Sequence, residues 1–183
     1  MSKRLTKEGW IDYALESLSQ NGYKSLNAVS LAQELGVSRG SFYWHFSNIA
    51  DFELQLMASW RQRTTEAVIK ELESEQSAEQ RLTKLVDLTL SNELALDKAI
   101  RSWSLEDSRA GQIVTEVDNQ RILYVESLFD AILTNKQDAA LRAKVLYWSC
   151  IGKSVIEVDS KSTYSKADIK RMLNLFLTNY STT

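Results

Sequence analysis

The chain has 183 residues, contains no proline and only six glycines, and carries a formal net charge of −2. This composition favours long helices over a turn-rich sheet protein, and it argues against a protein that coats nucleic acid through overall positive charge. The single cysteine, Cys150, excludes an intramolecular disulfide. We find no apolar run of membrane-spanning length and no signal-peptide pattern, and therefore predict a soluble, cytoplasmic protein with no membrane partner.

A first helix is predicted from Thr6 to Asn21. Thr6 can cap its start, and apolar side chains then recur at helical spacing. Asn21 and Gly22 together form a strong stop signal. We expect the apolar stripe of this helix to support the two helices that follow.

The next twenty residues, beginning at Asn27, predict two short helices around a tight turn. Asn27 can cap the first helix, and Gly36 stands where a helix ends most easily in the left-handed conformation. Ser38 can cap the second helix, in which Phe42 and Phe46 share one face. This is the pattern of a helix-turn-helix, whose second helix enters the DNA major groove.

The other face of this second helix is rich in groups that suit DNA. Arg39 can offer a two-pronged hydrogen bond to guanine, the commonest base-specific pairing. Gly40 lets the backbone approach the groove, and Tyr43 and His45 carry donors suited to phosphate oxygens. A helical pair that only packs has little reason to gather such side chains on its outer side. The predicted DNA-binding residues are Asn27, Ser38, Arg39, Gly40, Ser41, Tyr43, Trp44 and His45.

Residues 22–55 resemble the N-terminal DNA-binding segment of the TetR family of transcriptional regulators. The resemblance implies a homodimeric, ligand-responsive regulator with a three-helix DNA-binding head. One departure from the family pattern matters for DNA binding, because Ile49 stands where a lysine usually contacts a phosphate, and we expect that contact to be absent. The resemblance is carried by Gly22, Asn27 (usually threonine), Leu31, Ala32, Gly36, Val37, Ser38, Gly40, Ser41, Tyr43, Trp44, His45 and Phe46.

A fourth helix is predicted to begin at Ser47 or Asn48 and to continue to Leu72, where a polar run ends it. A helix of this length leaves the head and enters the body of the protein, so it is the predicted mechanical link between them. We predict two domains, with residues 1–47 binding DNA and residues 48–183 binding a ligand and dimerising.

Five further helices complete the predicted body. Ser77 with Gln80 and Ser165 with Asp168 form capping boxes that open two of them. The expected fold is all-α, with about nine helices and an N-terminal head that contains the helix-turn-helix. The predicted body helices lie at residues 77–90, 96–108, 111–132, 138–158 and 165–180, and residues 99–129 also resemble the middle of TetR-family regulatory domains.

The helix at residues 138–158 is apolar on nearly every side, and a soluble helix of this kind must be covered on two sides. One neighbouring helix cannot do this. We therefore predict a twofold dimer in which the last two helices of each subunit form a four-helix bundle. The predicted interface residues are Trp148, Ile151, Val155, Ile169, Met172, Leu173, Phe176, Leu177 and Tyr180.

Aromatic side chains are spread over four body helices where leucine would serve a closed bundle. They predict a pocket for an aromatic or amphipathic effector, with a few polar groups among mostly apolar ones. Trp103 lies in a segment that often gates the pocket in related regulators. The alternative is that these aromatics only fill a core. The predicted pocket residues are Trp60, Trp103, Glu106, Gln120, Tyr124 and Trp148.

No catalytic, metal or cofactor site is predicted. The only histidine, His45, lies in the recognition helix, and neither a zinc site nor a nucleophilic triad can be assembled. The sequence favours a repressor that a small-molecule inducer releases from a pseudo-palindromic operator. One alternative is a ligand-independent DNA-binding protein of the same fold, acting through a protein partner or in nucleoid organisation. Another is a helical enzyme or adaptor in which the head only packs.

Overall fold

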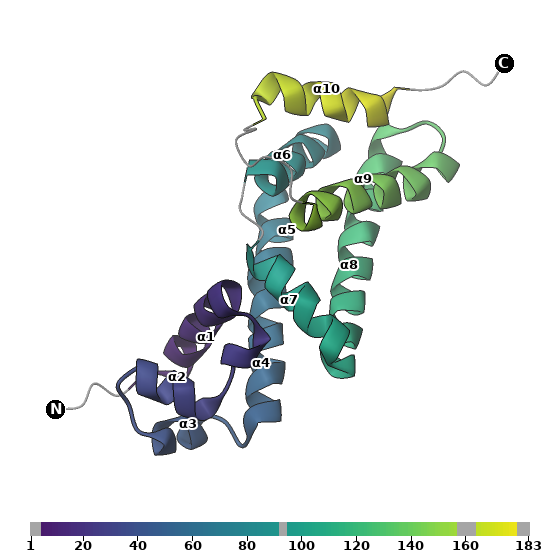
Figure 1. Ribbon diagram of the computed structural model, residues 1–183. Coiled ribbons are helices and arrows are strands. Elements are labelled where there is room, and N and C mark those ends of the chain that lie inside the picture. The colour runs from purple at the N-terminus through teal and green to yellow at the C-terminus, as the bar shows by residue number, and fades with distance from the viewer. Residues whose placement is uncertain (1–4, 92–94, 157–163, 179–183) are drawn as a thin grey trace. The chain divides into compact units, whose positions relative to one another are not determined.

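The computed structural model describes residues 5–91, 95–156 and 164–178. These ranges contain helices and no strand, which confirms the predicted all-α fold, and none of their helices is long and apolar enough to cross a membrane. With the continuous run from α4 to α5 counted once, the same ranges hold nine α-helices, as predicted. The elements are α1 (Lys7–Asn21), η1 (Tyr23–Ser25), α2 (Ala28–Glu34), α3 (Arg39–His45), α4 (Ile49–Arg61), η2 (Gln62–Glu66), α5 (Ala67–Leu72), α6 (Ala78–Ser91), α7 (Ala95–Glu106), α8 (Ser108–Ile132), α9 (Gln137–Val155) and α10 (Lys166–Leu177) (Figure 1).

The helices divide into two compact units. The first unit joins the chain up to Glu66 with Ala95–Glu116, and the second joins Ala67–Leu94 with the chain from Val117 onward. The first unit therefore contains the predicted head together with α4 and α7. The functional boundary proposed after residue 47 stays a prediction.

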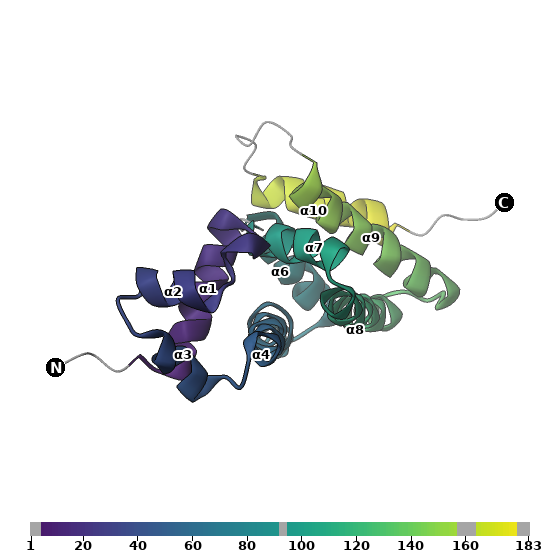
Figure 2. The same cartoon turned by 60° about the horizontal axis from the view of Figure 1, so that its bottom comes forward.

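The head of the first unit is built around an aromatic core, where α1 packs against α4 and α2 packs against α3 (Figures 1 and 2). The ring of Phe42 in α3 lies 5.4 Å from Trp10, 5.0 Å from Phe46 and 5.1 Å from Phe52, measured between ring centroids. All four side chains are buried. Each such aromatic pair contributes about 0.5–1.5 kcal/mol beyond the burial of its surface. The apolar face predicted for the recognition helix is thus the centre of this core.

Side-chain caps fix where the helices of the first unit begin. Thr6, Asn27 and Asn48 accept hydrogen bonds of 2.8–3.0 Å from backbone N–H groups three residues later, as the sequence predicted. The cap predicted at Ser38 is wrong in one respect: Ser38 stands at the N-cap position, but its hydroxyl makes no capping hydrogen bond. The N–H of Ser41 donates to the backbone carbonyl of Ser38 instead.

Two glycines stop helices where the sequence placed stop signals. Gly22 follows α1 and Gly36 follows α2, and their φ angles are +73° and +65°. Side chains with a Cβ rarely adopt this region, so glycine ends a helix there at the lowest cost. The chain then turns sharply from α2 into α3.

The helical backbone runs without interruption from Ile49 to Leu72, which confirms the predicted long helix and its end. Its middle differs from the prediction, because η2 is a π-helical segment. The hydroxyl of Thr64 in this segment donates to the carbonyl of Trp60 at 2.8 Å. Such segments are often found at functional sites, and apolar periodicity alone does not reveal them.

Helix α8 begins at Ser108, three residues before the predicted start. The reason is the carboxylate of Asp107, which accepts hydrogen bonds of 2.9 Å from the N–H groups of Arg109 and Ala110. A carboxylate at this position caps the helix and complements its dipole. The sequence pattern did not identify this cap.

The second unit has its own apolar core, formed by α6, α8, α9 and α10. Both predicted capping boxes are present, one between Ser77 and Gln80 and one between Ser165 and Asp168. They fix the starts of α6 and α10, which pack against each other. The buried residues of this core are Leu82, Val86, Val125, Leu128, Phe129, Leu133, Ala139, Ala143, Leu146, Ile169 and Leu173.

Candidate nucleic-acid interface

The recognition helix α3 separates a buried face from an exposed one. Phe42 is buried in the head, whereas Arg39, Gly40 and Tyr43 are exposed and Trp44 is 67% exposed. This separation follows from the helical period, since Phe42 and its neighbours on either side point in different directions. The structure therefore presents these predicted DNA-binding side chains outward.

Arg39 and Tyr43 form a pair on the exposed face. They stand four residues apart on α3, so one lies above the other on the helix surface. A guanidinium nitrogen of Arg39 donates to the hydroxyl of Tyr43 at 3.1 Å, and the guanidinium carbon lies 5.3 Å from the centroid of the tyrosine ring. Both residues are exposed, so the pair lies at the surface of the head.

The side chain of His45 contacts the backbone of the residue that precedes the cap of α1. Its Nε2 lies 2.9 Å from the carbonyl oxygen of Leu5, in a partly buried position. A carbonyl can only accept, so Nε2 carries the proton in this contact. The phosphate contact predicted for His45 stays a prediction, and it requires either the other ring nitrogen or release of Leu5.

Two more predicted positions lie near the helix starts. The amide of Asn27 is used within α2, where its oxygen accepts from the N–H of Ser30 and its nitrogen donates to the hydroxyl of Ser30. A Cβ added at Gly40 would lie 3.7 Å from the hydroxyl oxygen of Ser38, an ordinary contact distance. Packing within the chain therefore does not require glycine at position 40, while close approach of DNA would.

Sequence comparison agrees with this geometry. The family model described as "Bacterial regulatory proteins, tetR family" matches residues 11–54, which span the helix-turn-helix. The tetracycline repressor protein class D of Escherichia coli is 44% identical over 45 residues, and the regulator AcrR of Shigella flexneri is 36% identical over 73 residues. The DNA-binding segment at residues 11–54 belongs to the TetR family. The two matches span 25% and 40% of this chain, and only 21% and 32% of those relatives.

Two solved structures share the fold over almost the whole chain. Reduced NemR of E. coli matches with a TM-score of 0.79 and 14% identity, covering 95% of this chain and 98% of that one. FadR of Bacillus subtilis, solved with stearoyl-CoA, matches with a TM-score of 0.73 and 16% identity, covering 96% of this chain and all of that one. At this level of identity the likeness extends to the fold alone.

The position at which this chain departs from the TetR pattern lies at the start of α4. Ile49 is the first residue of that helix, directly after its cap Asn48, and is 39% exposed. Its side chain has no donor. A helix start itself attracts phosphate through its free N–H groups, so this position suits a backbone contact even without the lysine.

Two of the predicted effector residues pack inside the first unit. Trp60 is fully buried, and its indole N–H donates to the carboxylate of Asp97 at 2.7 Å. Trp103 is buried and stacks on Tyr23, with ring centroids 4.7 Å apart and planes 13° apart. Glu106, near Trp103, is exposed. Packing of this kind is what the core-filling alternative predicts for these two tryptophans, and their role in a TetR-type pocket stays a prediction.

Two other predicted effector residues carry buried polar atoms in the second unit. Among the residues that the structure describes, the side-chain oxygen of Gln120 and the hydroxyl of Tyr124 are buried without a hydrogen-bond partner. Both belong to α8, four residues apart, so they share one face. Burial raises the pKa of Tyr124 above its ordinary value of 10.0. Trp148, the remaining predicted pocket residue, is 62% exposed.

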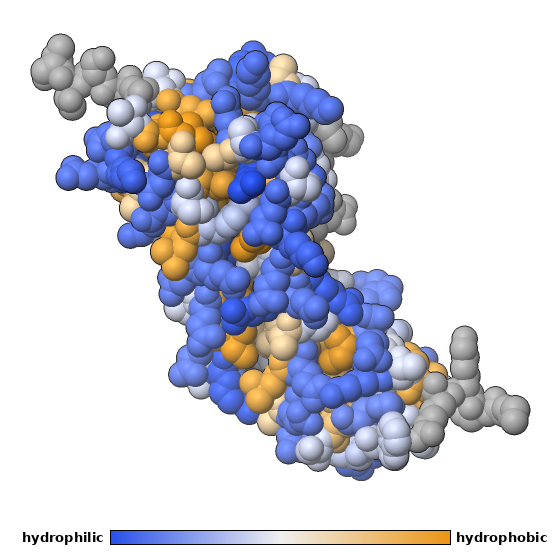
Figure 3. Space-filling model, turned by 180° about the vertical axis from the view of Figure 1, so that it is seen from behind, coloured by the Kyte–Doolittle hydropathy of each residue, from blue (hydrophilic) through white to orange (hydrophobic). Residues whose placement is uncertain are grey.

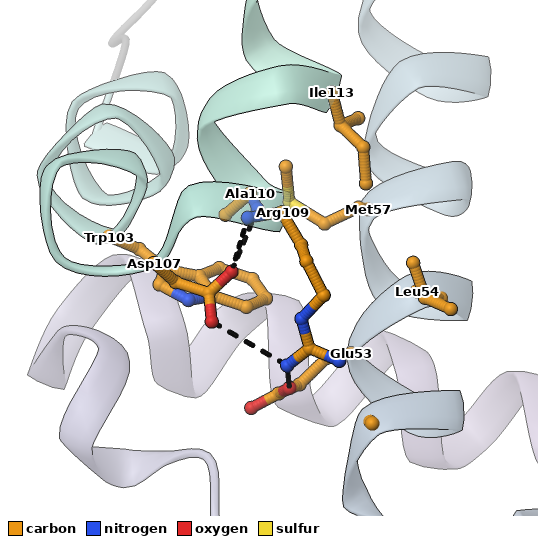
Figure 4. Close-up of a pocket in the computed structure, with 9 residues that line it drawn as sticks. Glu53, Leu54, Met57, Trp103, Asp107, Arg109, Ala110 and Ile113 are labelled. Carbon is orange, nitrogen blue, oxygen red and sulfur yellow. Dashed lines mark hydrogen bonds and ion pairs between the residues drawn. The ribbon is translucent and has the colours of Figure 1, made fainter.

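A small hollow lies in the first unit, between α4 and the segment that joins α7 to α8 (Figure 4). Its volume is about 10 Å³, which is room for about one water molecule and too little for an effector. Trp103, Met57 and Ile113 contribute apolar side chains, while Glu53 and Arg109 contribute charge.

Sequence reasoning missed the charged residues of this hollow. Glu53 occupies a position in the apolar stripe of α4, beside the buried Phe52 and Met57. An acidic residue on a buried helix face needs a partner. The place of Glu53 in the apolar stripe is therefore the signal in the sequence that identifies it as paired. Its partners, Tyr23 and Arg109, are distant in sequence, so no local pattern identifies them.

The predicted dimer residues differ in how far they are exposed. Trp148 is exposed on α9 and Ile151 is partly so, whereas Ile169 and Leu173 of α10 are buried in the core of their own unit. Met172, Phe176 and Leu177 are partly exposed. The side chain of Val155 and all of Tyr180 lie outside the described residues.

Of the two helices in the predicted dimer interface, α9 carries an exposed apolar stripe. Leu141 is 63% exposed, and Val145 and Trp148 follow at helical spacing on the same face. Figure 3, which shows one side of the molecule, has apolar patches among mostly hydrophilic side chains. An exposed apolar stripe on a helix is typical of a surface that a partner covers.

Proposed function

We propose that this protein is a homodimeric transcriptional repressor that binds a pseudo-palindromic operator and releases it when a small molecule binds in the body. The outward presentation of Arg39 and Tyr43 on α3, in a segment of the TetR family, carries the proposal. The helix-turn-helix places the start of the recognition helix against base edges, and Arg39 is its first residue.

The apolar stripe on α9 supports the proposed dimer. Leu141, Val145 and Trp148 present a continuous apolar surface that a second copy would remove from water. A twofold dimer would set its two recognition helices about 34–36 Å apart, one helical turn of DNA. Two half-sites with inverted symmetry then form the operator.

The effector is expected in the second unit, near the buried polar atoms of Gln120 and Tyr124. A buried polar atom without a partner costs about 1–3 kcal/mol, which a bound molecule that hydrogen-bonds it would recover. The related FadR was solved with stearoyl-CoA, so one regulator of this fold holds a bound ligand. For this chain we propose an aromatic or amphipathic effector that hydrogen-bonds these two groups.

A ligand-independent regulator of the same fold is the second candidate. The burial of Trp60 and Trp103 within the first unit supports it, because the indole of Trp60 is hydrogen-bonded to Asp97 and the ring of Trp103 is stacked on Tyr23. Screening small molecules by thermal shift separates the two candidates. A compound that raises the melting temperature and releases operator DNA supports the inducible repressor.

DNA binding is tested by selecting duplexes from a random pool and measuring affinity for the selected sequence by fluorescence anisotropy. We expect an inverted repeat and a preference over unrelated duplex of about 10³-fold or more. The dimer is tested by sedimentation, with Val145→Asp expected to give monomers and Lys70→Asp, at an exposed position on α5 outside the stripe, expected to leave the dimer intact. Failure to bind any duplex more tightly than random DNA would exclude the proposed function.

A further inference from the structure

Glu53 is a buried acidic residue whose two carboxylate oxygens have partners from different parts of the chain. Oε1 accepts a 2.9 Å hydrogen bond from the hydroxyl of Tyr23, and Oε2 lies 3.3 Å from a guanidinium nitrogen of Arg109. The side chain of Glu53 is only 9% exposed. A carboxylate at this depth is unfavourable unless it is paired, so both partners hold it in place.

Tyr23, Glu53 and Arg109 form a chain of contacts, which we call the Glu53 link, and Tyr23 is its end in the head. Tyr23 opens η1, the single turn between α1 and α2, and its carbonyl accepts from the N–H of Leu26, directly before the cap Asn27. Its ring stacks on Trp103 of α7. Tyr23 is therefore held at its hydroxyl by α4 and at its ring by α7, and its position sets where the helix-turn-helix begins.

Arg109 is the other end, in the first turn of α8. The guanidinium nitrogen that contacts Glu53 also lies 3.5 Å from the carboxylate of Asp107, which caps this helix. Figure 4 shows Arg109 reaching from α8 to Glu53 on α4, with the carboxylate of Asp107 beside it. One guanidinium thus joins the start of α8 to the carboxylate that holds Tyr23.

We propose that Glu53 is a positioning residue for DNA binding, which fixes the helix-turn-helix through Tyr23 and ties that position to the first turn of α8 through Arg109. The inference rests on the proposed DNA-binding function. Neither Tyr23, Glu53 nor Arg109 belongs to the recognition helix. Their effect is on the fraction of molecules whose head is held ready for DNA, and apparent affinity falls in proportion to that fraction.

The core of the head does not depend on this link. Trp10, Phe42, Phe46 and Phe52 pack around one another without Tyr23, Glu53 or Arg109 in the ring contacts. A variant that loses the link should therefore keep a folded head while losing its fixed position. This separates a positioning role from a structural one.

Three substitutions break the link at different points. Tyr23→Phe removes one hydroxyl and keeps the stacking on Trp103. Glu53→Gln keeps the shape and an acceptor for Tyr23 but removes the charge that pairs with Arg109. Arg109→Gln removes the guanidinium, and Arg109→Lys restores a cation.

The head offers a matched control pair. The hydroxyl of Tyr13 donates to the carboxylate of Glu34 at 2.8 Å, in an exposed position within the head. Tyr13→Phe and Glu34→Gln make the same chemical changes as Tyr23→Phe and Glu53→Gln, but they do not connect the head to α4 or α8. Any general effect of removing a tyrosine–glutamate hydrogen bond appears in this pair as well.

The experiment measures affinity for the selected operator, its salt dependence and the thermal unfolding midpoint of each full-length variant. We expect Tyr23→Phe and Glu53→Gln to lower affinity about tenfold, with the controls near the parent and the salt slope unchanged, because no phosphate contact is lost. Arg109→Lys should recover most of what Arg109→Gln loses. Tyr23→Phe combined with Arg109→Gln should lose less than the product of the single losses, because both act through one carboxylate.

Parental affinity in both Tyr23→Phe and Glu53→Gln would overturn the inference, as would equal losses in the control pair or a shallower salt slope. If Glu53→Gln unfolds below the assay temperature, Tyr23→Phe decides, since it removes a single oxygen atom. A parent protein that binds no duplex specifically would overturn the proposed function instead, so the two failures are distinguishable.

Discussion

The indole N–H of Trp60 donates a 2.7 Å hydrogen bond to the buried carboxylate of Asp97, which joins α4 to α7 inside the first unit. Trp60→Phe keeps an aromatic ring but removes the donor. We expect a loss of about 1.5–3 kcal/mol in the free energy of unfolding, as for other hydrogen bonds to charged groups. Urea unfolding followed by circular dichroism measures it. Trp44→Phe, at an exposed position, is the control and should change stability by less than about 0.5 kcal/mol.

Arg39→Ala is expected to relax sequence preference at one operator position and to cost about 1–3 kcal/mol of binding free energy there. Tyr43→Phe should instead weaken all duplexes by a similar factor, since a phosphate contact carries no sequence information. Anisotropy titrations against the selected operator and single-base variants distinguish these effects. Uniform weakening by Arg39→Ala would show that Arg39 contacts only the backbone.

Gly40→Ala separates folding from DNA binding. A methyl group at this position meets no close neighbour in the chain, and alanine favours a helix over glycine by about 0.5–1 kcal/mol. The variant should therefore be as stable as the parent, or slightly more so, and bind the operator more weakly. Its melting temperature and its operator affinity are measured on the same preparation. Unchanged affinity would mean that the groove does not approach the backbone here.

Ile49→Lys should tighten operator binding and make the slope of log affinity against log salt steeper by about 0.9, as expected for one more neutralised phosphate. The start of α4, where Ile49 is partly exposed, is suited to such a contact. Leu54→Lys is the matched control, because it adds the same charge at an exposed position further along α4. If both variants steepen the slope equally, the effect is one of general charge.

Acid should destabilise the protein through aspartates at helix starts. The pKa of Asp107 lies below its ordinary value of 3.8, chiefly because the backbone N–H of Ala110 donates to it, and that of Asp168 is lowered chiefly by the hydroxyl of Ser165. A carboxyl whose pKa is lowered by folding stabilises the protein above its unfolded pKa and loses this effect as pH falls through the folded value. Unfolding midpoints should therefore fall as the pH drops below 3.8. Asp107→Asn should weaken this dependence, because the amide that replaces the carboxyl does not titrate.

The helix-turn-helix was predictable because its signals are local. Asn27 caps within three residues, and Gly36 adopts the positive φ that its position required. Phe42 and Phe46 share one face because of their four-residue spacing. Each of these features depends on a few neighbouring residues, so one sequence is enough to read them.

The features that were missed depend on residues far apart in the chain. The pairing of Tyr23 with Glu53 spans 30 residues, and that of Glu53 with Arg109 spans 56. The π-helical segment η2 has the same polar and apolar pattern as a regular helix. Tertiary contacts determine the pairing of Glu53, and apolar periodicity does not distinguish a π-helical segment from an α-helical one.

The two faces of α3 have an evolutionary consequence. Its inner face is fixed by Phe42 in the aromatic core, while Arg39 and Tyr43 are exposed on the outer face, where the ring of Tyr43 makes one edge contact with Phe42. Changes at exposed positions usually alter stability by less than about 0.5 kcal/mol. Descendants of a duplicated gene can therefore acquire new operators one residue at a time, with every intermediate still folded.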